Sequence, residues 1–255
     1  MTSAFCLLPS ALRKLIVTAD DVGLDRGMTA GAIEAHRNGI VTACSIVANG
    51  REFDDAVARL RDVPALEVGV HLTLVEERAL TTGKPMPSDW MRFLISRKTN
   101  VESELRAQIE RVVATGLRVT HLNGHQHLHQ WPRISRIVRR LAGEYGIHYV
   151  RTVNDRGGIR RRLAVALLSR LAGEGARRHT TIGVAEAGHL TAERIVALFD
   201  CVSGVTELVA HPGLNVAGYA HWNYEWENET RALCDPRVRE AIGDKNIQLI
   251  GPSKA

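Results

Sequence analysis

Short apolar segments of the kind that form buried β-strands alternate with longer segments of helical periodicity along most of the chain. Apolar runs bounded by turn residues predict strands at 14–19, 44–48, 66–74, 117–123, 148–153, 180–185, 206–213 and 247–251. Helical spacing predicts helices at 27–39, 52–60, 101–116, 133–146 and 190–202, and two helical pieces that break at Pro236. This α/β alternation is typical of a parallel sheet, and seven or eight mainly parallel strands predict a closed or nearly closed (β/α) barrel. A doubly wound open sheet is the alternative.

No internal repeat, low-complexity linker or shift in composition divides the chain. Its 255 residues therefore predict one domain spanning 1–255, in which 1–13 form a loose lead-in. The segment 76–99 has no clear period, and we expect a long loop there with one short helix at about 90–95. Long loops in compact domains are often functional.

The composition is that of a soluble globular protein, with 45% hydrophobic and 24% charged residues. No stretch approaches the roughly 20 apolar residues that a membrane-spanning helix needs. The first residues lack the basic start and the long apolar run of a signal peptide. Four scattered cysteines without a CxxC pair are typical of a reducing compartment. We therefore expect a cytoplasmic protein.

The chain is basic, with a formal net charge of +5 and an isoelectric point near 9.3. Aromatic residues make up only 5% and do not interleave with a basic patch, so no nucleic-acid partner is expected. The segment 155–179 combines many arginines with apolar residues at helical spacing. A solvated surface helix is the simpler interpretation. The alternative is a contact with anionic lipid at a membrane surface.

Four histidines fall within nine residues of the sequence HLNGHQHLHQWP, directly after the alternating GLRVTHL. They are His121, His125, His127 and His129, and Asn123 keeps the alternation between the first two. Since every second side chain of an extended segment points the same way, His121, Asn123 and His125 are expected to reach one site. Neutral imidazole is the commonest metal ligand among side chains, so this density favours metal or acid–base chemistry. The alternative is a solvated loop, or histidines hydrogen-bonded for structural reasons.

Polar side chains stand at the predicted ends of four strands, where the site of a (β/α) barrel lies. They are Asp20 and Asp21, His71, the group His121, Asn123 and His125, and His211. Two histidines and a carboxylate can bind a divalent ion, which polarises a carbonyl oxygen and lowers the pKa of a water. A second carboxylate could take the proton of that water, and a further histidine could protonate a leaving group. Asp20, Asp21, His71, His125 and His211 supply each of these parts once.

The blocks LIVTADDVGL, GVHLTL, THLNGHQHLHQWP and ELVAHPG, in this order between Lys14 and Gly213, resemble the YdjC-like carbohydrate deacetylases, the family of the chitooligosaccharide deacetylase ChbG. The segments GHLTAERIVALF and HWNYEWENETRALCDPRVREAI resemble its branch associated with hopanoid biosynthesis, called HpnK. The resemblance implies a deformed (β/α) barrel, one divalent metal ion (Mg²⁺ or Zn²⁺), and removal of the N-acetyl group from an amino sugar. The substrate would be an oligosaccharide or a lipid-linked, for instance hopanoid-linked, N-acetylglucosamine.

The resemblance also implies a role for each matching residue. The second aspartate of the ADD block, Asp21, the histidine of GVHL, His71, and the first histidine of HQHLH, His125, would ligate the metal. Asp20 would be the general base, and His211 of the AHPG block would be the general acid.

Four further residues of the histidine-rich segment would bind substrate or support the ligands: His121, Asn123, His127 and His129. The family usually has phenylalanine at the position of Val22, a change that removes no ligand. It often has aspartate where this chain has Asn123, and an asparagine cannot act as a base.

Two other functions stay open on the sequence alone. One is a metal-dependent phosphoesterase or another amidohydrolase built from the same ligands, and the other is a non-catalytic sugar-binding protein. The basic segment 155–179 would suit a lipid-linked sugar at the inner face of the membrane. A homodimer is compatible with the sequence, although no feature specifies one.

Overall fold

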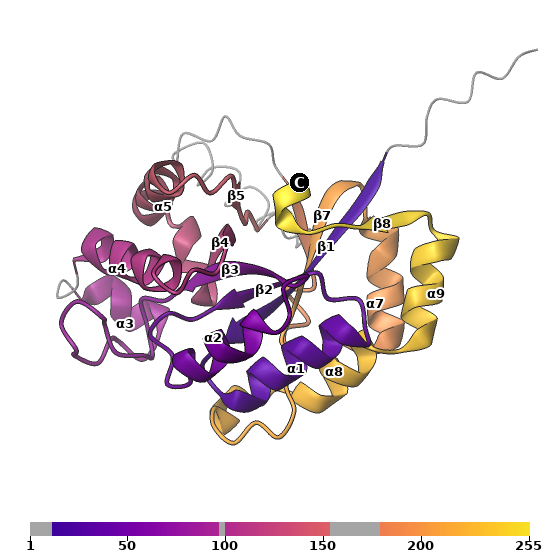
Figure 1. Cartoon of the computed structure of the whole chain (residues 1–255), viewed down its shortest axis with the longest axis horizontal. Coiled ribbons are helices and arrows are strands. Elements are labelled where there is room, and N and C mark those ends of the chain that lie inside the picture. The colour runs from indigo at the N-terminus through magenta and orange to yellow at the C-terminus, as the bar shows by residue number, and fades with distance from the viewer. Residues whose placement is uncertain (1–11, 97–99, 154–178) are drawn as a thin grey trace, which may run out of the picture.

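The computed structural model describes residues 12–96, 100–153 and 179–255. One curled sheet lies at its centre, with helices packed around the outside of the curl (Figure 1). The strands are β1 (Arg13–Val22), β2 (Ala43–Ile46), β3 (Glu67–Leu72), β4 (Val119–Gly124), β5 (Tyr149–Val150), β6 (Thr180–Ile182), β7 (Gly204–Ala210) and β8 (Ile247–Leu249). Every pair of neighbouring strands is parallel.

The strand order is β5-β4-β3-β2-β1-β7-β6, and β8 pairs with β1 off this path. One side of β1 pairs with β7 from Arg13 to Ala19. The other side pairs with β8 at its start and with β2 at its end. The predicted α/β barrel of seven or eight parallel strands is confirmed, as an incompletely closed curl.

The position of β1 follows from its sequence, RKLIVTADDV, of which the last eight residues are buried. A strand covered on both faces needs a continuous apolar run, and parallel sheets are covered in this way. Leu15 and Val17 belong to the main apolar core between sheet and helices, whereas Ile16 packs in a small separate cluster with Ala43 and Tyr149. The two carboxylates of this strand, Asp20 and Asp21, stand at its end, which is where the site forms.

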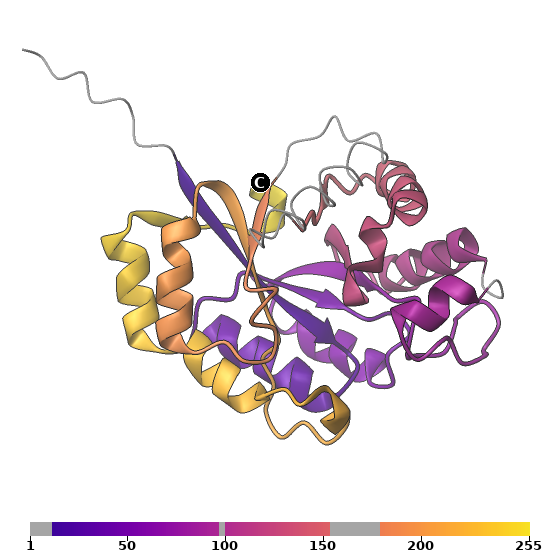
Figure 2. The same ribbon diagram turned by 180° about the vertical axis from the view of Figure 1, so that it is seen from behind.

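Helices cover the outer face of the curl, and Figure 2 shows the same arrangement from behind. They are α1 (Arg26–Arg37), α2 (Phe53–Arg61), α3 (Trp90–Ile95), α4 (Val101–Val113), α5 (Pro132–Glu144), α7 (Ala192–Leu198), α8 (Trp226–Leu233) and α9 (Pro236–Asp244). Short 3₁₀ turns are η1 (His125–Gln130), η2 (Phe199–Cys201), η3 (Ala220–Trp222) and η4 (Pro252–Lys254). Side-chain caps begin several helices: Asp25 accepts from Gly27 N, Asn100 from Ser103 N, and Thr191 from Arg194 N.

The two edge strands of the curl, β5 and β6, meet through side chains rather than through a backbone ladder. Thr181 Oγ1 donates to the carbonyl of Thr152 at 2.7 Å, and Thr152 Oγ1 donates to the carbonyl of His179 at 3.3 Å. The rings of Tyr149 and His179 stack with centroids 5.0 Å apart. In a closed barrel, β5 and β6 would pair along their backbones. Here these side-chain contacts hold the two edge strands together.

The structure corrects one sequence prediction at the histidine-rich segment. We expected the strand alternation to carry from His121 to His125, but β4 ends at Gly124 and η1 begins at His125. Gln126 and His127 then adopt positive φ values of 50° and 55°, which an extended strand excludes. The helix expected at 155–179 lies, apart from its last residue, outside the described residues.

Among the residues that the structure describes, no helix combines the length and the apolar character needed to cross a bilayer.

Candidate metal centre and active site

The end of β1 contains an irregularity that turns two consecutive carboxylates toward one site. The register with β2 shifts between Ala19 and Val22, and Asp21 has a φ of 65°, which non-glycine residues seldom adopt. Consecutive strand side chains ordinarily point to opposite faces. Here Asp20 Oδ1 lies 3.9 Å from one nitrogen of His71, and Asp21 Oδ1 lies 3.2 Å from the other. Both carboxylates therefore face the same imidazole.

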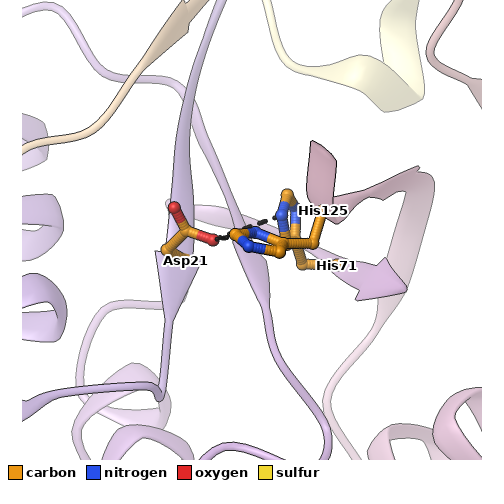
Figure 3. A group of neighbouring side chains, drawn as sticks. All are labelled: Asp21, His71 and His125. Carbon is orange, nitrogen blue, oxygen red and sulfur yellow. Dashed lines mark hydrogen bonds and ion pairs between the residues drawn. The ribbon is translucent and has the colours of Figure 1, made fainter. Parts of the chain in front are cut away.

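Three elements each bring one metal-ligating side chain to this point (Figure 3). Asp21 from β1, His71 from β3 and His125 from η1 offer ligand atoms that all lie within 4.8 Å of one another. Asp21 Oδ1 is 3.2 Å from His71 Nε2 and 3.1 Å from His125 Nδ1. Ligands about 2 Å from a tetrahedral ion lie about 3.3 Å apart. The three side chains therefore fit a single divalent ion in spacing as well as in chemistry.

Asn123 fixes the orientation of His71. Asn123 Oδ1 lies 2.8 Å from His71 Nδ1, and because an amide oxygen can only accept, that nitrogen carries the proton. The lone pair is then on Nε2, which faces Asp21. The amide nitrogen of Asn123 donates to Asp20 Oδ1 at 2.9 Å and to Ser45 Oγ at 3.1 Å. An asparagine here positions His71, a role in which a base is not needed.

His125 lies between two carboxylates. Its Nδ1 is 3.1 Å from Asp21 Oδ1, and its Nε2 is 3.4 Å from Glu76 Oε2. Burial alone would lower the pKa of His125, but Asp21 and Glu76 outweigh it and raise this pKa to about 10. Burial likewise opposes ionisation of Asp21, yet His125 and His71 hold its pKa well below the usual range. The site thus favours a positive charge between these groups, which a metal ion would supply in place of the proton.

Asp20 is held by a buried arginine. The fully buried guanidinium of Arg151, directly after β5, donates from Nη2 to Asp20 Oδ1 at 2.9 Å and to Glu207 Oε1 at 2.8 Å. Glu207, on β7, also accepts from Thr18 Oγ1 and from the Tyr149 hydroxyl. Burial disfavours the charge on Asp20, but Arg151 more than compensates and holds the pKa of Asp20 well below its usual value. Asp20 is therefore an anion at every physiological pH.

His211 follows β7 on the other side of Asp21. Its Nε2 lies 3.9 Å from Asp21 Oδ2, and its Nδ1 lies 3.9 Å from Glu229 Oε1. Glu229, on α8, accepts from the backbone N–H of His211 at 2.5 Å and from that of Leu190 at 3.4 Å. Burial lowers the pKa of His211 and raises that of Glu229 to about 8. Tyr224 packs edge-on against the His211 ring, with centroids 5.2 Å apart.

The remaining histidines of the segment lie outside the ligand group. His121 is fully buried inside the curl, edge-on to Tyr149 and against Gly69, where any side chain would overlap its ring. His129 Nε2 lies 3.1 Å from the carbonyl of Arg151 and so tethers the residue that holds Asp20. His127 stands beside His129, and burial lowers the pKa of each to about 3.

An aromatic side chain packs against one histidine of the ligand group. The Trp222 ring stacks on His125 with centroids 5.2 Å apart and an interplanar angle of 27°. The loop that contains Trp222 is held by two hydrogen bonds. Asp25 Oδ2 accepts from the backbone N–H of Gly218 at 3.1 Å, and the Tyr219 hydroxyl donates to Glu77 Oε1 at 2.7 Å. This loop bridges α1 and the segment after β3 beside the candidate site.

Several residues of the site were not predicted from the sequence: Glu76, Arg151, Glu207, Trp222 and Glu229. Two of them carried a usable signal. Glu207 and Arg151 are charges of opposite sign within the apolar stretches TELVA and HYVRTV, and a charge in a buried strand requires a partner. Glu76 follows β3 and Trp222 lies in η3, where charged and aromatic residues are ordinary. Glu229 is buried on α8, but the polar sequence around it, WENET, gives no sign of burial.

A family model described as YdjC-like protein matches residues 14–244 of the chain. A curated protein named carbohydrate deacetylase, from Brevibacillus brevis (strain 47), is 33% identical over 250 residues, covering 93% of this chain and 97% of the relative. Another protein named carbohydrate deacetylase, from Geobacillus stearothermophilus, is 28% identical over 250 residues, covering 93% and 96%.

Solved structures share the fold. A crystal structure from Enterococcus faecalis V583, described with a provisional role in cellobiose-phosphate cleavage, has a TM-score of 0.77 at 25% identity and covers 96% of this chain and 99% of its own. A family 4 carbohydrate esterase from Streptomyces lividans, in complex with acetate, has a TM-score of 0.55 at 12% identity and covers 95% of each chain, which shows a common fold alone. The match over most of the chain confirms the resemblance seen in the sequence: this chain belongs to the YdjC-like family, whose curated relatives are named carbohydrate deacetylases.

Proposed function

We propose that the protein is a metal-dependent carbohydrate deacetylase, a hydrolase that removes the N-acetyl group from an amino sugar. One observation carries the proposal. Three metal-ligating side chains, a buried ionised carboxylate and a further histidine converge at one edge of the sheet, in a chain related to proteins named carbohydrate deacetylases.

Asp21, His71 and His125 are the proposed metal ligands. When bound, a divalent ion would polarise the acetyl carbonyl and lower the pKa of a water molecule. Two imidazoles with one carboxylate favour Zn²⁺ or another first-row ion over Mg²⁺, which prefers oxygen ligands throughout. We therefore propose Zn²⁺ as the ion of this site.

Asp20 is the proposed general base and His211 the proposed general acid. Asp20 is held ionised by Arg151, so it can accept a proton from water as the water oxygen bonds to the acetyl carbon. His211, on the other side of Asp21, would donate a proton to the sugar nitrogen as the C–N bond breaks. Amide and water give acetic acid and a free amine, and the proton that Asp20 takes up offsets the one that the imidazolium form of His211 gives, so atoms and charge balance.

The roles of the flanking residues follow from their contacts. Asn123 and Ser45 would hold His71 and Asp20 in place, and His129 would hold Arg151. Trp222 lies directly over His125, where a flat aromatic face can stack against a sugar ring. For the sugar we propose N-acetylglucosamine, either within an oligosaccharide or linked to a lipid, for which the resemblance to the hopanoid-associated branch gives sequence support.

Acetate release tests the proposal directly. The purified protein, stripped of metal with a chelator and reloaded with Zn²⁺, is incubated with chitin oligosaccharides, and acetate and free amine are measured. Equal amounts of both products, lost on stripping and restored on reloading, are expected. Release of phosphate from a phosphate ester, without acetate, would replace the proposal with a phosphoesterase. Sugar binding without any release on long incubation would leave a binding protein.

A further inference from the structure

The helix α3 exposes most of its apolar side chains. Phe93 alone among its large apolar residues is buried, and it anchors the helix to the core. Ile95 is 84% exposed, and Trp90, at 44%, stands beside the exposed Trp131 with ring centroids 6.1 Å apart. We call the exposed set the α3 apolar surface: Trp90, Met91, Leu94, Ile95 and Trp131.

The five side chains form one surface rather than isolated exposures. Trp90 and Leu94, and likewise Met91 and Ile95, are four residues apart on a helix and lie on neighbouring turns. Trp131 extends the surface from α3 onto the start of α5. Single exposed apolar residues are ordinary, whereas a contiguous group marks a contact with a partner, a ligand or lipid.

The α3 apolar surface is connected to the candidate metal centre. The backbone N–H of Trp90 donates to Gln126 Oε1 at 3.2 Å, and Gln126 Nε2 donates to Glu76 Oε1 at 3.0 Å. The other oxygen of Glu76 lies 3.4 Å from His125 Nε2. Two side chains therefore separate the exposed helix from a proposed metal ligand. A partner or ligand bound to the α3 apolar surface would therefore lie next to the candidate metal centre.

The area and the side-chain types of the surface distinguish between a second copy of the chain, a sugar and a lipid bilayer as its binding partner. Five side chains at these exposures offer on the order of 500 Å² of apolar area, which is less than the roughly 800 Å² per partner that a stable dimer buries. Sugars stack on aromatic rings, whereas Met91, Leu94 and Ile95 have none, so a sugar does not match most of this surface. Protruding aliphatic side chains with tryptophans beside them are typical of elements that enter the interfacial layer of a membrane.

Positive charge accompanies the surface. Arg92, on the same helix, has a side chain that is 74% exposed and lies 3.6 Å from Asp89, which offsets part of its charge, and Arg133 is exposed two residues after Trp131. Cationic side chains beside an inserted apolar group add attraction to anionic headgroups.

We propose that the α3 apolar surface binds the surface of a lipid bilayer and so presents the neighbouring metal centre to sugars displayed at that surface. The first part of the proposal, binding to lipid, rests on the exposed residues of α3 and Trp131. The second part, presentation of the metal centre to sugars at the membrane, also rests on the proposed deacetylase function.

Vesicle binding tests the first part. The full chain is sedimented with phosphatidylcholine vesicles containing phosphatidylglycerol, and the Trp fluorescence is recorded in parallel. The double variant Met91→Glu, Ile95→Glu is expected to lower the vesicle partition coefficient at least tenfold and to reduce the blue shift of the wild type. The matched control is Val113→Glu, which adds a charge at a 44% exposed apolar residue at the end of α4 and should bind as the wild type does.

The outcomes separate the alternatives. Wild-type protein that does not bind vesicles, or a double variant that binds as tightly as the wild type, overturns the proposal. A wild-type dimer that the double variant converts to a monomer, without vesicle binding, overturns it in favour of a second copy. Equal melting temperatures of variant and wild type show that the surface change, not unfolding, is responsible.

Kinetics test the second part. The double variant should keep the wild-type kcat/KM on a soluble chitin oligosaccharide and lose at least tenfold on the same sugar anchored to a lipid in vesicles. Equal losses on both substrates overturn this part. Vesicle binding through α3 without acetate release from either substrate would support the lipid surface and overturn the deacetylase proposal, so the two failures are distinguishable.

Discussion

Asp20 and Asp21 are neighbours in the sequence with opposite surroundings. Asp20 faces the guanidinium of Arg151, and Asp21 faces two imidazoles. The left-handed φ of Asp21 makes this separation possible at the end of one strand. Two like residues can then serve different roles, one as an ionised acceptor and the other as a ligand.

Replacing Asp20 by Asn should separate catalysis from metal binding. The change removes the proposed base but leaves all three proposed ligands, so kcat for acetate release should fall about 10²–10⁴-fold while metal content stays at the wild-type level. Asp235→Asn makes the same chemical change at a half-buried helix cap outside the site and should retain wild-type kcat. Asp20→Asn activity within twofold of wild type would remove Asp20 from the role of base.

At the residue scale, the sequence predicted side chains that carry recognisable chemistry and missed those that support them. Asp20, Asp21, His71, His125 and His211 stand at strand ends, and the strand pattern is visible in the sequence. Arg151 contacts Asp20 across 131 positions, a pairing that only the closing of the curl creates. Local patterns show that a charge in a buried strand needs a partner, but not which residue the partner is.

At the scale of elements, the junction of β4 and η1 determines which histidines reach the site. The strand places Asn123 against His71, and the 3₁₀ turn then brings His125 to Asp21. Alternation in the sequence predicted the first placement but not the second, because the turn depends on positive φ values at Gln126 and His127. His121 is instead buried against β3, where Gly69 leaves room for its ring.

This packing predicts a strong effect at Gly69. A Cβ at this position would lie 2.4 Å from His121 Nε2, so Gly69→Ala should destabilise the fold by about 1–3 kcal/mol. Gly143→Ala is the matched control: its Cβ meets no atom, and the change within α5 should stabilise by about 0.5–1 kcal/mol. Urea unfolding measures both.

A second variant identifies the cause. If the overlap with the ring is responsible, Gly69→Ala should cost less in a His121→Ala background than in the wild type. An equal cost in both backgrounds would assign the loss to the backbone of β3 instead.

At the scale of the whole molecule, the curl depends on pairing charges in its interior. Arg151, Asp20 and Glu207 form one buried ionic group between β1, β7 and the end of β5. Buried charges are stable only when paired, and removing one partner is costly. The fold class, a closed or nearly closed barrel, was predictable from the sequence because alternation is a local pattern. The place where the curl stays open, between β5 and β6, was not, because it depends on side-chain contacts such as that of Thr181 with Thr152.

Three histidines that are neutral in the folded chain predict how stability depends on pH: His121 and His129 are buried, and His127 is half-buried. Burial lowers the pKa of His121 to about 4 and that of His127 and His129 to about 3. The unfolded chain protonates these groups near 6.5, so between pH 6.5 and 4 it binds more protons than the folded chain. Stability should therefore fall as the pH falls, by about 1.4 kcal/mol per pH unit for each such histidine.

Urea unfolding of metal-free protein at pH 6.5, 5.5 and 4.5 measures this slope. His121→Ala, which removes one of these groups, should reduce the slope. His125 has a raised pKa and contributes in the opposite sense, with stability that is lost only as the pH rises from 6.5 toward 10. A stability that is flat from pH 6.5 to 4.5 would contradict the neutral state of the three histidines in the folded chain.

The metal content of His71→Ala tests the central claim most directly. Elemental analysis of wild-type protein reloaded with Zn²⁺ and freed of excess should find one ion per chain. His71 supplies one of the three ligand atoms gathered within 4.8 Å, so His71→Ala should fall to a small fraction of this value. His189→Ala, which changes a histidine outside the ligand group, should keep one ion. One ion retained in His71→Ala, or none in the wild type, would contradict the assignment of Asp21, His71 and His125 as a single metal centre.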